Sequence, residues 1–103
     1  MAEAPQVTDN VDKHRFEVRL GDDVAFAEYR LKPGQMVLPH TVVPPAFEGK
    51  GVASALARHA FAEARARGLT VVPTCPFMAS WVKKHPEAQD VVDPTCKAEL
   101  GIA

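Results

Sequence analysis

The amino-acid sequence predicts a mixed α/β fold built on a single twisted sheet. Two observations support this class: the first half of the chain carries alternating strand patterns separated by turns, and the second half carries two helical patterns with a strand between them. We expect antiparallel N-terminal strands, then a strand–helix–strand crossover that places the fourth strand parallel to the third, then a C-terminal helix. The chain of 103 residues is expected to form one domain over residues 1–103, with residues 1–10 as a flexible tail.

Three strands are predicted in the first half. Residues 14–20 alternate between apolar and charged side chains, which is typical of a half-buried strand. A returning strand is expected over 24–31, and Pro33-Gly34 then suits the centre of a type II turn. The third strand is predicted over 36–43, and its prolines suit a bulge, an edge or a place where ladder bonding is interrupted.

The second half contains the crossover. Residues 51–67 place apolar side chains, many of them alanines, on one side of a helix, and Gly68 is a natural C-cap. The mostly apolar residues 69–75 predict a fourth strand with both faces covered. A second helix opened by a proline is predicted over 76–85, and residues 86–103 have no strong pattern.

Composition excludes several classes of function. The chain is 47% hydrophobic, enough for a core, and its formal net charge of −1 gives no basic field for nucleic acid. No run of about 18 apolar residues is available to span a membrane, and the N-terminus lacks the features of a secretory signal, so we expect a cytoplasmic protein with reduced thiols. Cys75 and Cys96 are too few and too far apart for a disulfide framework or a Cys-x-x-Cys metal site.

A glycine-rich loop precedes the first predicted helix. Gly49 and Gly51 flank Lys50, and the first N–H groups of a helix beginning there are unpaired at the positive end of its dipole. A strand, a glycine-rich loop and a helix together make an anion site, although the same residues also serve as a plain turn. The spacing matches neither a P-loop nor a complete dinucleotide fingerprint.

The loop resembles a more particular motif. The residues EGKGVA at 48–53 resemble the Gln/Arg-x-x-Gly-x-Gly/Ala motif of the GCN5-related N-acetyltransferases, and the resemblance extends over residues 38–64 and 68–87. This stretch is similar to the compact, single-domain members of that family. The resemblance implies an acetyltransferase-like fold, acetyl-coenzyme A as co-substrate and no metal.

The resemblance also implies which residues bind coenzyme A. The loop amides are expected to hold the pyrophosphate, and the pantetheine arm is expected to pair with the backbone at the end of the third strand. The cofactor-binding residues implied are Val42, Val43, Phe47, Gly49, Lys50, Gly51, Val52 and Ala53. Glu48 stands where larger members carry Gln or Arg, so we expect its side chain to point away. The last strands of larger members are missing, which predicts an acceptor pocket that is open or completed by a partner.

Two residues are candidates for chemistry. His40 is in step with Met36, Leu38 and Val42 on the third strand, a pattern that suits a buried histidine or a functional one. Cys75 precedes the second helix, where it can be a small core residue or a thiolate stabilised by the helix dipole. Neighbouring strands would bring both near the carboxyl ends of the sheet, and the resemblance implies that both line the acetyl-transfer channel.

The sequence therefore predicts an acetyl-coenzyme A-dependent N-acetyltransferase acting on an unidentified amine or protein acceptor. The alternative is a coenzyme A-binding module with little or no turnover. Transfer can be direct, with His40 as general base, or pass through an acyl group on Cys75 that His40 helps to form; we favour direct transfer. Tyr29 is the only tyrosine and lies on the second strand, so the tyrosine general acid of larger members has no counterpart.

Overall fold

A computed structural model describes residues 6–47 and 49–102 of the chain. One sheet of five strands has the order β1-β2-β3-β4-β5, with antiparallel pairing from β1 to β4 and parallel pairing between β4 and β5. The strands are β1 Thr8–Asn10, β2 Arg15–Leu20, β3 Asp23–Lys32, β4 Gln35–Val42 and β5 Thr70–Val72. The helices are α1 Val52–Ala66, α2 Pro76–Lys83 and α3 Pro94–Leu100, with short 3-10 helices η1 Val11–Lys13, η2 Pro45–Phe47 and η3 Pro86–Val91. The predicted mixed α/β class and the parallel crossover are confirmed.

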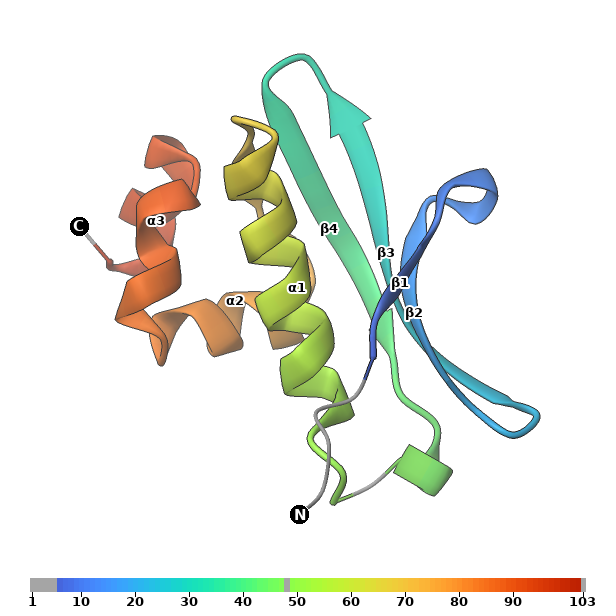
Figure 1. Ribbon diagram of the computed structural model, residues 1–103. Coiled ribbons are helices and arrows are strands. Elements are labelled where there is room, and N and C mark those ends of the chain that lie inside the picture. Colours follow the sequence, from blue (N-terminus) through green and yellow to red (C-terminus); the bar gives the residue numbers. More distant parts are fainter. Residues whose placement is uncertain (1–5, 48, 103) are drawn as a thin grey trace.

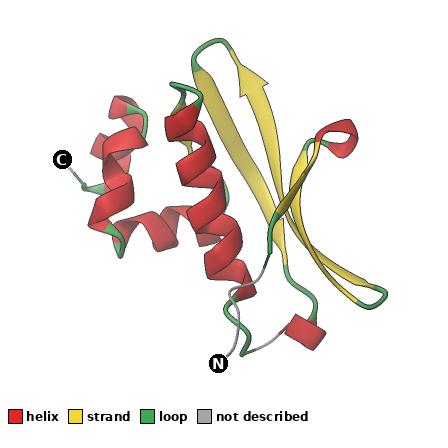
Figure 2. Cartoon of the chain, viewed as in Figure 1, coloured by secondary structure: helices red, strands yellow, loops and turns green. Residues whose placement is uncertain are grey.

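The α-helices all lie on one side of the sheet (Figures 1 and 2). The core fills the space between this covered face and α1, where Ala57, Ala60 and Ala64 are fully buried. Their small side chains allow the helix to approach the strands closely. Within the described part of the chain, no helix has both the length and the apolar character needed to cross a membrane.

Both ends of the described chain differ from the prediction. The prediction of a flexible tail is wrong for Thr8–Asn10, which form β1 and pair with β2. Residues 1–5 lie outside the described residues. Asp9 fixes this strand, because it accepts hydrogen bonds from the Tyr29 hydroxyl at 2.6 Å and from Arg67 at 3.0 Å. At the other end, η3 and α3 occupy a stretch for which no element was predicted.

A β-bulge in β4 separates two registers. Glu28 of β3 pairs with His40, whereas Arg30 pairs with Val37, so one step more is taken along β4 than along β3. Pro39 lies in this bulge, as its missing N–H allows. The extra residue reverses the side on which later side chains emerge, because alternation in a strand has a period of two.

The bulge overturns the prediction that His40 is in step with Met36 and Leu38. Thr41 pairs with Ala27, which is buried on the covered face, so Thr41 shares that face with Met36 and Leu38. His40 lies on the opposite, open face and is exposed. The expected alignment of His40 with Val42 holds, since both follow the bulge.

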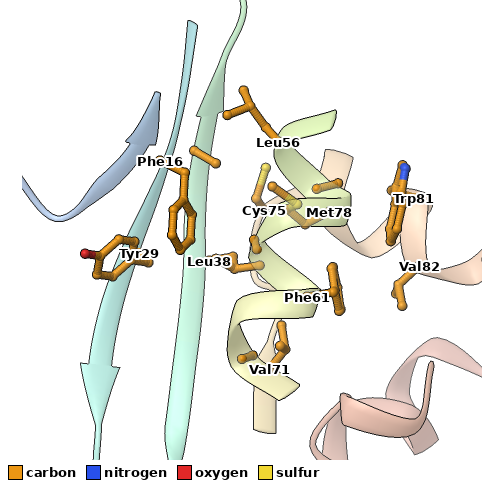
Figure 3. Packing of buried hydrophobic residues seen from close by; sticks show 14 of the residues in the cluster. Phe16, Tyr29, Leu38, Leu56, Phe61, Val71, Cys75, Met78, Trp81 and Val82 are labelled. Carbon is orange, nitrogen blue, oxygen red and sulfur yellow. The ribbon is translucent and has the colours of Figure 1, made fainter. Parts of the chain in front are cut away.

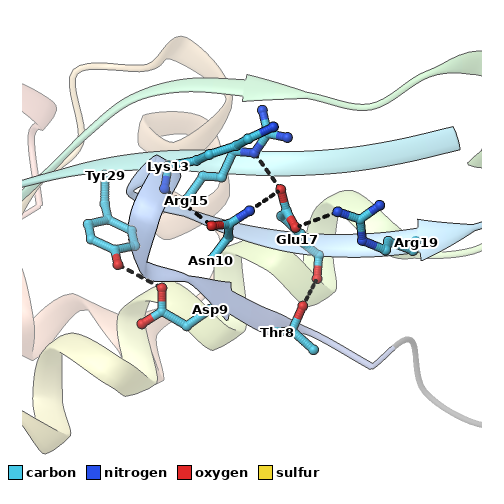
Figure 4. Close-up of polar contacts among 8 residues, drawn as sticks. All are labelled: Thr8, Asp9, Asn10, Lys13, Arg15, Glu17, Arg19 and Tyr29. Atoms are coloured by element: carbon cyan, nitrogen blue, oxygen red, sulfur yellow. Dashed lines mark hydrogen bonds and ion pairs between the residues drawn. The ribbon is translucent and has the colours of Figure 1, made fainter.

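The open face carries a buried carboxylate in a network of polar groups (Figure 4). Glu17 is 2% exposed and accepts hydrogen bonds from Arg15 at 2.5 Å, Asn10 at 3.1 Å and Arg19 at 3.4 Å. The Arg15 guanidinium also lies over the Phe26 ring, 4.2 Å from its centroid. Burial raises the pKa of Glu17, but the hydrogen bonds from Arg15 and Asn10 outweigh it and leave the pKa below its ordinary value.

Candidate functional site

The second half of β4 has a strand partner on one side only. Parallel pairing with β5 covers Gln35–Val37, and the last backbone link across is the hydrogen bond from the Cys75 N–H to the Leu38 carbonyl at 2.9 Å. Past that point β4 pairs with β3, and among the described residues no strand covers its other edge. The chain that leaves β5 turns instead into α2. Free backbone groups along an edge are available to another chain or to a ligand.

The direction of these backbone groups follows from their alternation along the strand. The Thr41 N–H faces the sulfur of Cys75, on the free side of β4. Because successive strand residues direct their backbone groups to opposite neighbours, an extension of β4 to Val43 would direct the backbone groups of Val43 to the side of Thr41. His40 and Val42 direct theirs toward Glu28 and Phe26 of β3.

The glycine loop joins this edge to α1. Gly49 and Gly51 have φ angles of 76° and 69°, in the left-handed region that favours glycine, and Gly51 is the N-cap of α1. A Cβ at either position would meet no atom within 4 Å. Backbone conformation is therefore the reason for glycine at both positions in this structure. Glu48, expected to point away from the loop, lies outside the described residues.

The amides at the start of α1 are directed into this loop. The Ala55 N–H makes the first helical hydrogen bond, to the Gly51 carbonyl at 3.0 Å, and Gly51 offers no side-chain cap. The N–H groups of Val52 and Ala53 have no acceptor among residues 6–47 and 49–102. The Lys50 N–H is already used, since it donates to the Phe47 carbonyl at 3.2 Å.

The predicted binding residues differ in what they can present. Gly49, Lys50 and Gly51 are exposed, so the Lys50 side chain is accessible to solvent beside the helix N-terminus. Phe47 and Val52 are buried in the core at 2% and 3% exposure. Their side chains anchor the loop, and their backbone is the part that remains able to face a ligand.

Cys75 is the N-cap of α2 and lies within the core (Figure 3). Its side chain is 6% exposed, and its thiol donates to the Thr41 hydroxyl at 3.5 Å. Burial raises the pKa of this thiol, but the Thr41 hydroxyl and the N–H groups of Met78 and Phe77 outweigh it and leave the pKa below its ordinary value. The N–H groups act through their dipoles, since they form no capping hydrogen bond to the sulfur.

The structure does not pair the two residues proposed for chemistry. Cys75 lies on the covered side of the sheet and His40 on the open side, and within the described chain no hydrogen bond joins them. Thr41, which the sequence did not single out, is the polar partner of the thiol. Pro39 is the one signal that could have pointed to Thr41, since a proline inside a strand suggests a bulge.

Other candidate groups have structural roles. The Tyr29 hydroxyl is held by Asp9, and burial together with this hydrogen bond raises the pKa of Tyr29 to about 12. Burial, with Asp93 and Glu99 nearby, raises the pKa of the Cys96 thiol on α3. Within residues 6–47 and 49–102, no three His, Cys, Asp or Glu side chains form a group that could hold a metal ion.

Trp81 fixes α2 against α1. Its indole N–H donates to the Ser54 hydroxyl at 3.0 Å, and its ring stacks on Phe61 with centroids 5.4 Å apart. Ser54 belongs to the first turn of α1, so this contact ties the helix that begins at the glycine loop to the helix that begins at Cys75.

Comparison with known proteins bears on this arrangement. A sequence model described as GCN5-related N-acetyl-transferase matches residues 15–91, which include β4, the glycine loop and the start of α2. The fold is similar to the NMR solution structure of a GCN5-like N-acetyltransferase candidate from Staphylococcus aureus. That similarity has a TM-score of 0.69 and 24% sequence identity, and it covers 89% of this chain and 91% of the other.

Proposed function

This chain belongs to the GCN5-related N-acetyltransferase family, and on that premise we propose that it transfers the acetyl group of acetyl-coenzyme A to an amine in the cytoplasm. One observation carries the proposal. The free edge of β4 leads directly into a glycine loop behind which the first N–H groups of α1 are unpaired among the described residues. An extended arm and a phosphate group need these two features side by side.

The glycine loop is the proposed pyrophosphate site. The N–H groups of Val52 and Ala53 point out of the positive end of a helix of 15 residues, and phosphate oxygens accept from such groups. The exposed Lys50 adds a positive charge, while Gly49 and Gly51 leave the approach open.

The free edge of β4 is the proposed site of the pantetheine arm. Its amide groups can pair with the backbone of Val43 as a short added strand would, because an extension of β4 by one residue directs the N–H and carbonyl of Val43 away from β3. Val42 directs its backbone toward β3, so it would contact the arm through its exposed side chain.

His40 is the proposed general base for direct transfer. The acceptor amine forms a bond to the acetyl carbon, the carbon–sulfur bond breaks, and coenzyme A leaves as a thiolate. The proton of the attacking nitrogen passes to the imidazole of His40, since histidine is the side chain that most often serves as a general base. The separation of His40 from Cys75 by the sheet supports this route over one in which His40 activates the thiol.

A coenzyme A-binding module with little turnover is the second candidate. The observation that favours it is the lack of a positioned acid, since the Tyr29 hydroxyl is held by Asp9 within the core. Release of free coenzyme A thiol in the presence of a panel of amines separates the two. Amine-dependent release above the rate of thioester hydrolysis supports the enzyme, and tight binding without release supports the module.

The loop assignment is tested by Gly51→Ala against Gly34→Ala. Gly34 lies in the β3–β4 hairpin with φ 73°, close to the 69° of Gly51, and both have open space for a Cβ. Each variant is expected to lose roughly 1–2 kcal/mol of stability, the cost of an L side chain in the left-handed region. Only Gly51→Ala is expected to weaken acetyl-coenzyme A binding, by about tenfold in calorimetry. Equal affinities of the two variants would refute the loop as the pyrophosphate site.

A further inference from the structure

A pocket of about 290 Å³ lies at the edge of β3, outside the proposed coenzyme A site. It is lined by Lys13, His14, Glu28, Tyr29, Arg30 and Leu31. The pocket forms where β2 begins: the last β2–β3 pair joins Arg15 to Glu28, and the Tyr29 N–H donates to the His14 carbonyl at 2.9 Å. From there β3 continues to Lys32 while β2 does not accompany it, so one wall is a free strand edge.

Two cations without a carboxylate partner among the described residues line this pocket. Arg15, Arg19, Arg65 and Arg67 all form ion pairs with carboxylates. Lys13 and Arg30 form none within the described chain, although both line the same pocket. Two unpaired cations at one concave site attract an anion, and a carboxylate can bind an arginine through both of its oxygens.

Glu28 connects the pocket to His40. It lines the pocket and is also the cross-strand neighbour of His40, so both side chains emerge on the open face. Its carboxylate forms no ion pair with another described residue, which leaves it free to attract an ammonium group. Arg30 lies two residues after Glu28 on β3, about 7 Å away, and His40 lies opposite Glu28 on β4, about 5 Å to the side. The backbone positions of Arg30 and His40 are therefore separated by roughly 8 Å.

We propose that this pocket holds a carboxylate of the acceptor, an inference that rests on the proposed transfer to an amine. The acceptor class is then a molecule whose amine and carboxylate lie about 7–10 Å apart, the reach set by strand spacing. The ε-amine of free lysine and the linear compound 6-aminohexanoate have this form. The carboxylate binds between Lys13 and Arg30, and the ammonium approaches Glu28 next to His40.

The first test titrates the isotopically labelled full chain with three probes followed by NMR. The probes are 6-aminohexanoate, hexylamine without the carboxylate, and hexanoate without the amine. We expect 6-aminohexanoate to shift the amide signals of Lys13, His14 and Leu31 and to bind about fivefold more tightly than hexylamine. Equal affinity of the two amines, or shifts confined to other regions, would overturn the proposal.

Matched variants test the role of charge at this site. Arg30→Gln is expected to weaken 6-aminohexanoate about fivefold, and Lys32→Gln to leave it unchanged. Lys32 is an exposed cation on the same strand and the same face, but it does not line the pocket. Glu28→Gln is expected to weaken 6-aminohexanoate and not hexanoate. The same loss in Arg30→Gln and Lys32→Gln would mean general charge attraction and would count against a built site.

A parallel titration with acetyl-coenzyme A separates this inference from the function on which it rests. Shifts at the glycine loop with no response of the pocket to 6-aminohexanoate would overturn the pocket assignment alone. A pocket that responds while acetyl-coenzyme A leaves the loop unchanged would overturn the proposed function, and the acceptor role with it. Responses at both sites, with the affinities ordered as above, support the proposal.

Discussion

The two faces of the sheet are made by the same strands but have different roles. The covered face presents apolar side chains such as Phe16, Ala27 and Leu38, all with no exposed surface. The open face presents the Glu17 network, Glu28 and the exposed His40. Strand alternation keeps the groups that stabilise the fold apart from the groups available for binding, and one bulge in β4 decides to which face each candidate residue belongs.

The contrast in stability gives the largest expected effect. Leu38→Ala, on the covered face of β4, is expected to lower the free energy of unfolding by about 2–5 kcal/mol through lost burial and a residual cavity. Val42→Ala, on the open face of β4, is expected to change the free energy of unfolding by less than about 0.5 kcal/mol, because Val42 is 44% exposed. Urea denaturation measures both, and a similar cost for the two would mean that the open face is covered in solution.

The second largest expected effect on stability comes from Glu17, which is buried although it lies on the open face. Glu17→Gln is expected to cost about 1.5–3 kcal/mol at neutral pH, since a buried carboxylate with three donors is replaced by an amide. The pKa of folded Glu17 lies below the ordinary value of 4.5, so its contribution is present above that pH and is lost as the pH falls through the lowered pKa.

The difference between wild type and Glu17→Gln is therefore expected to shrink below about pH 4.5 in thermal denaturation. Glu28→Gln is the control, because Glu28 lies on the same face, half-buried and with no ion pair to a described residue. A difference that persists unchanged into acid would contradict the assigned network.

The smallest effect tests which β4 side chain reaches the thiol. Thr41→Val is expected to raise the pKa of Cys75, because it removes the hydroxyl that stabilises the thiolate. His40→Ala is expected to leave that pKa unchanged, since the imidazole lies across the sheet. Ultraviolet absorbance of the thiolate in a Cys96→Ser background measures both, and a shift in His40→Ala alone would restore the histidine as the partner of the thiol.

Local patterns predicted the elements whose signals lie within a few residues. Alternation located β2, the glycine loop located the start of α1, and Pro76 located the start of α2. The strand β1 could not be predicted, because Asp9 at its centre is held by Tyr29 and Arg67, which are 20 and 58 residues away. The helix α3 follows Asp93, a side-chain cap for the Thr95 N–H, but it is short and buries no residue fully.

The candidate site was predicted in its parts more than in its geometry. The glycine loop lies at the start of α1 and Cys75 at the start of α2, as the sequence indicated. The positions of His40 and Thr41 depend on the register of β4 against β3, and the sequence pattern within β4 does not determine that register. The roles of these residues in binding and transfer stay predictions.

The bulge at Pro39 has a consequence for how length changes act on this protein. Removing one residue within the bulge would restore a simple ladder in which His40 still pairs with Glu28, whereas removing one residue between the β3–β4 hairpin and the bulge would turn His40 inward and Thr41 outward. The number of residues between the β3–β4 hairpin and the bulge thus determines which side chains at the end of β4 face the core. Substitutions change single groups on this strand, whereas a deletion outside the bulge exchanges the set of side chains on the open face for the set that faces the core.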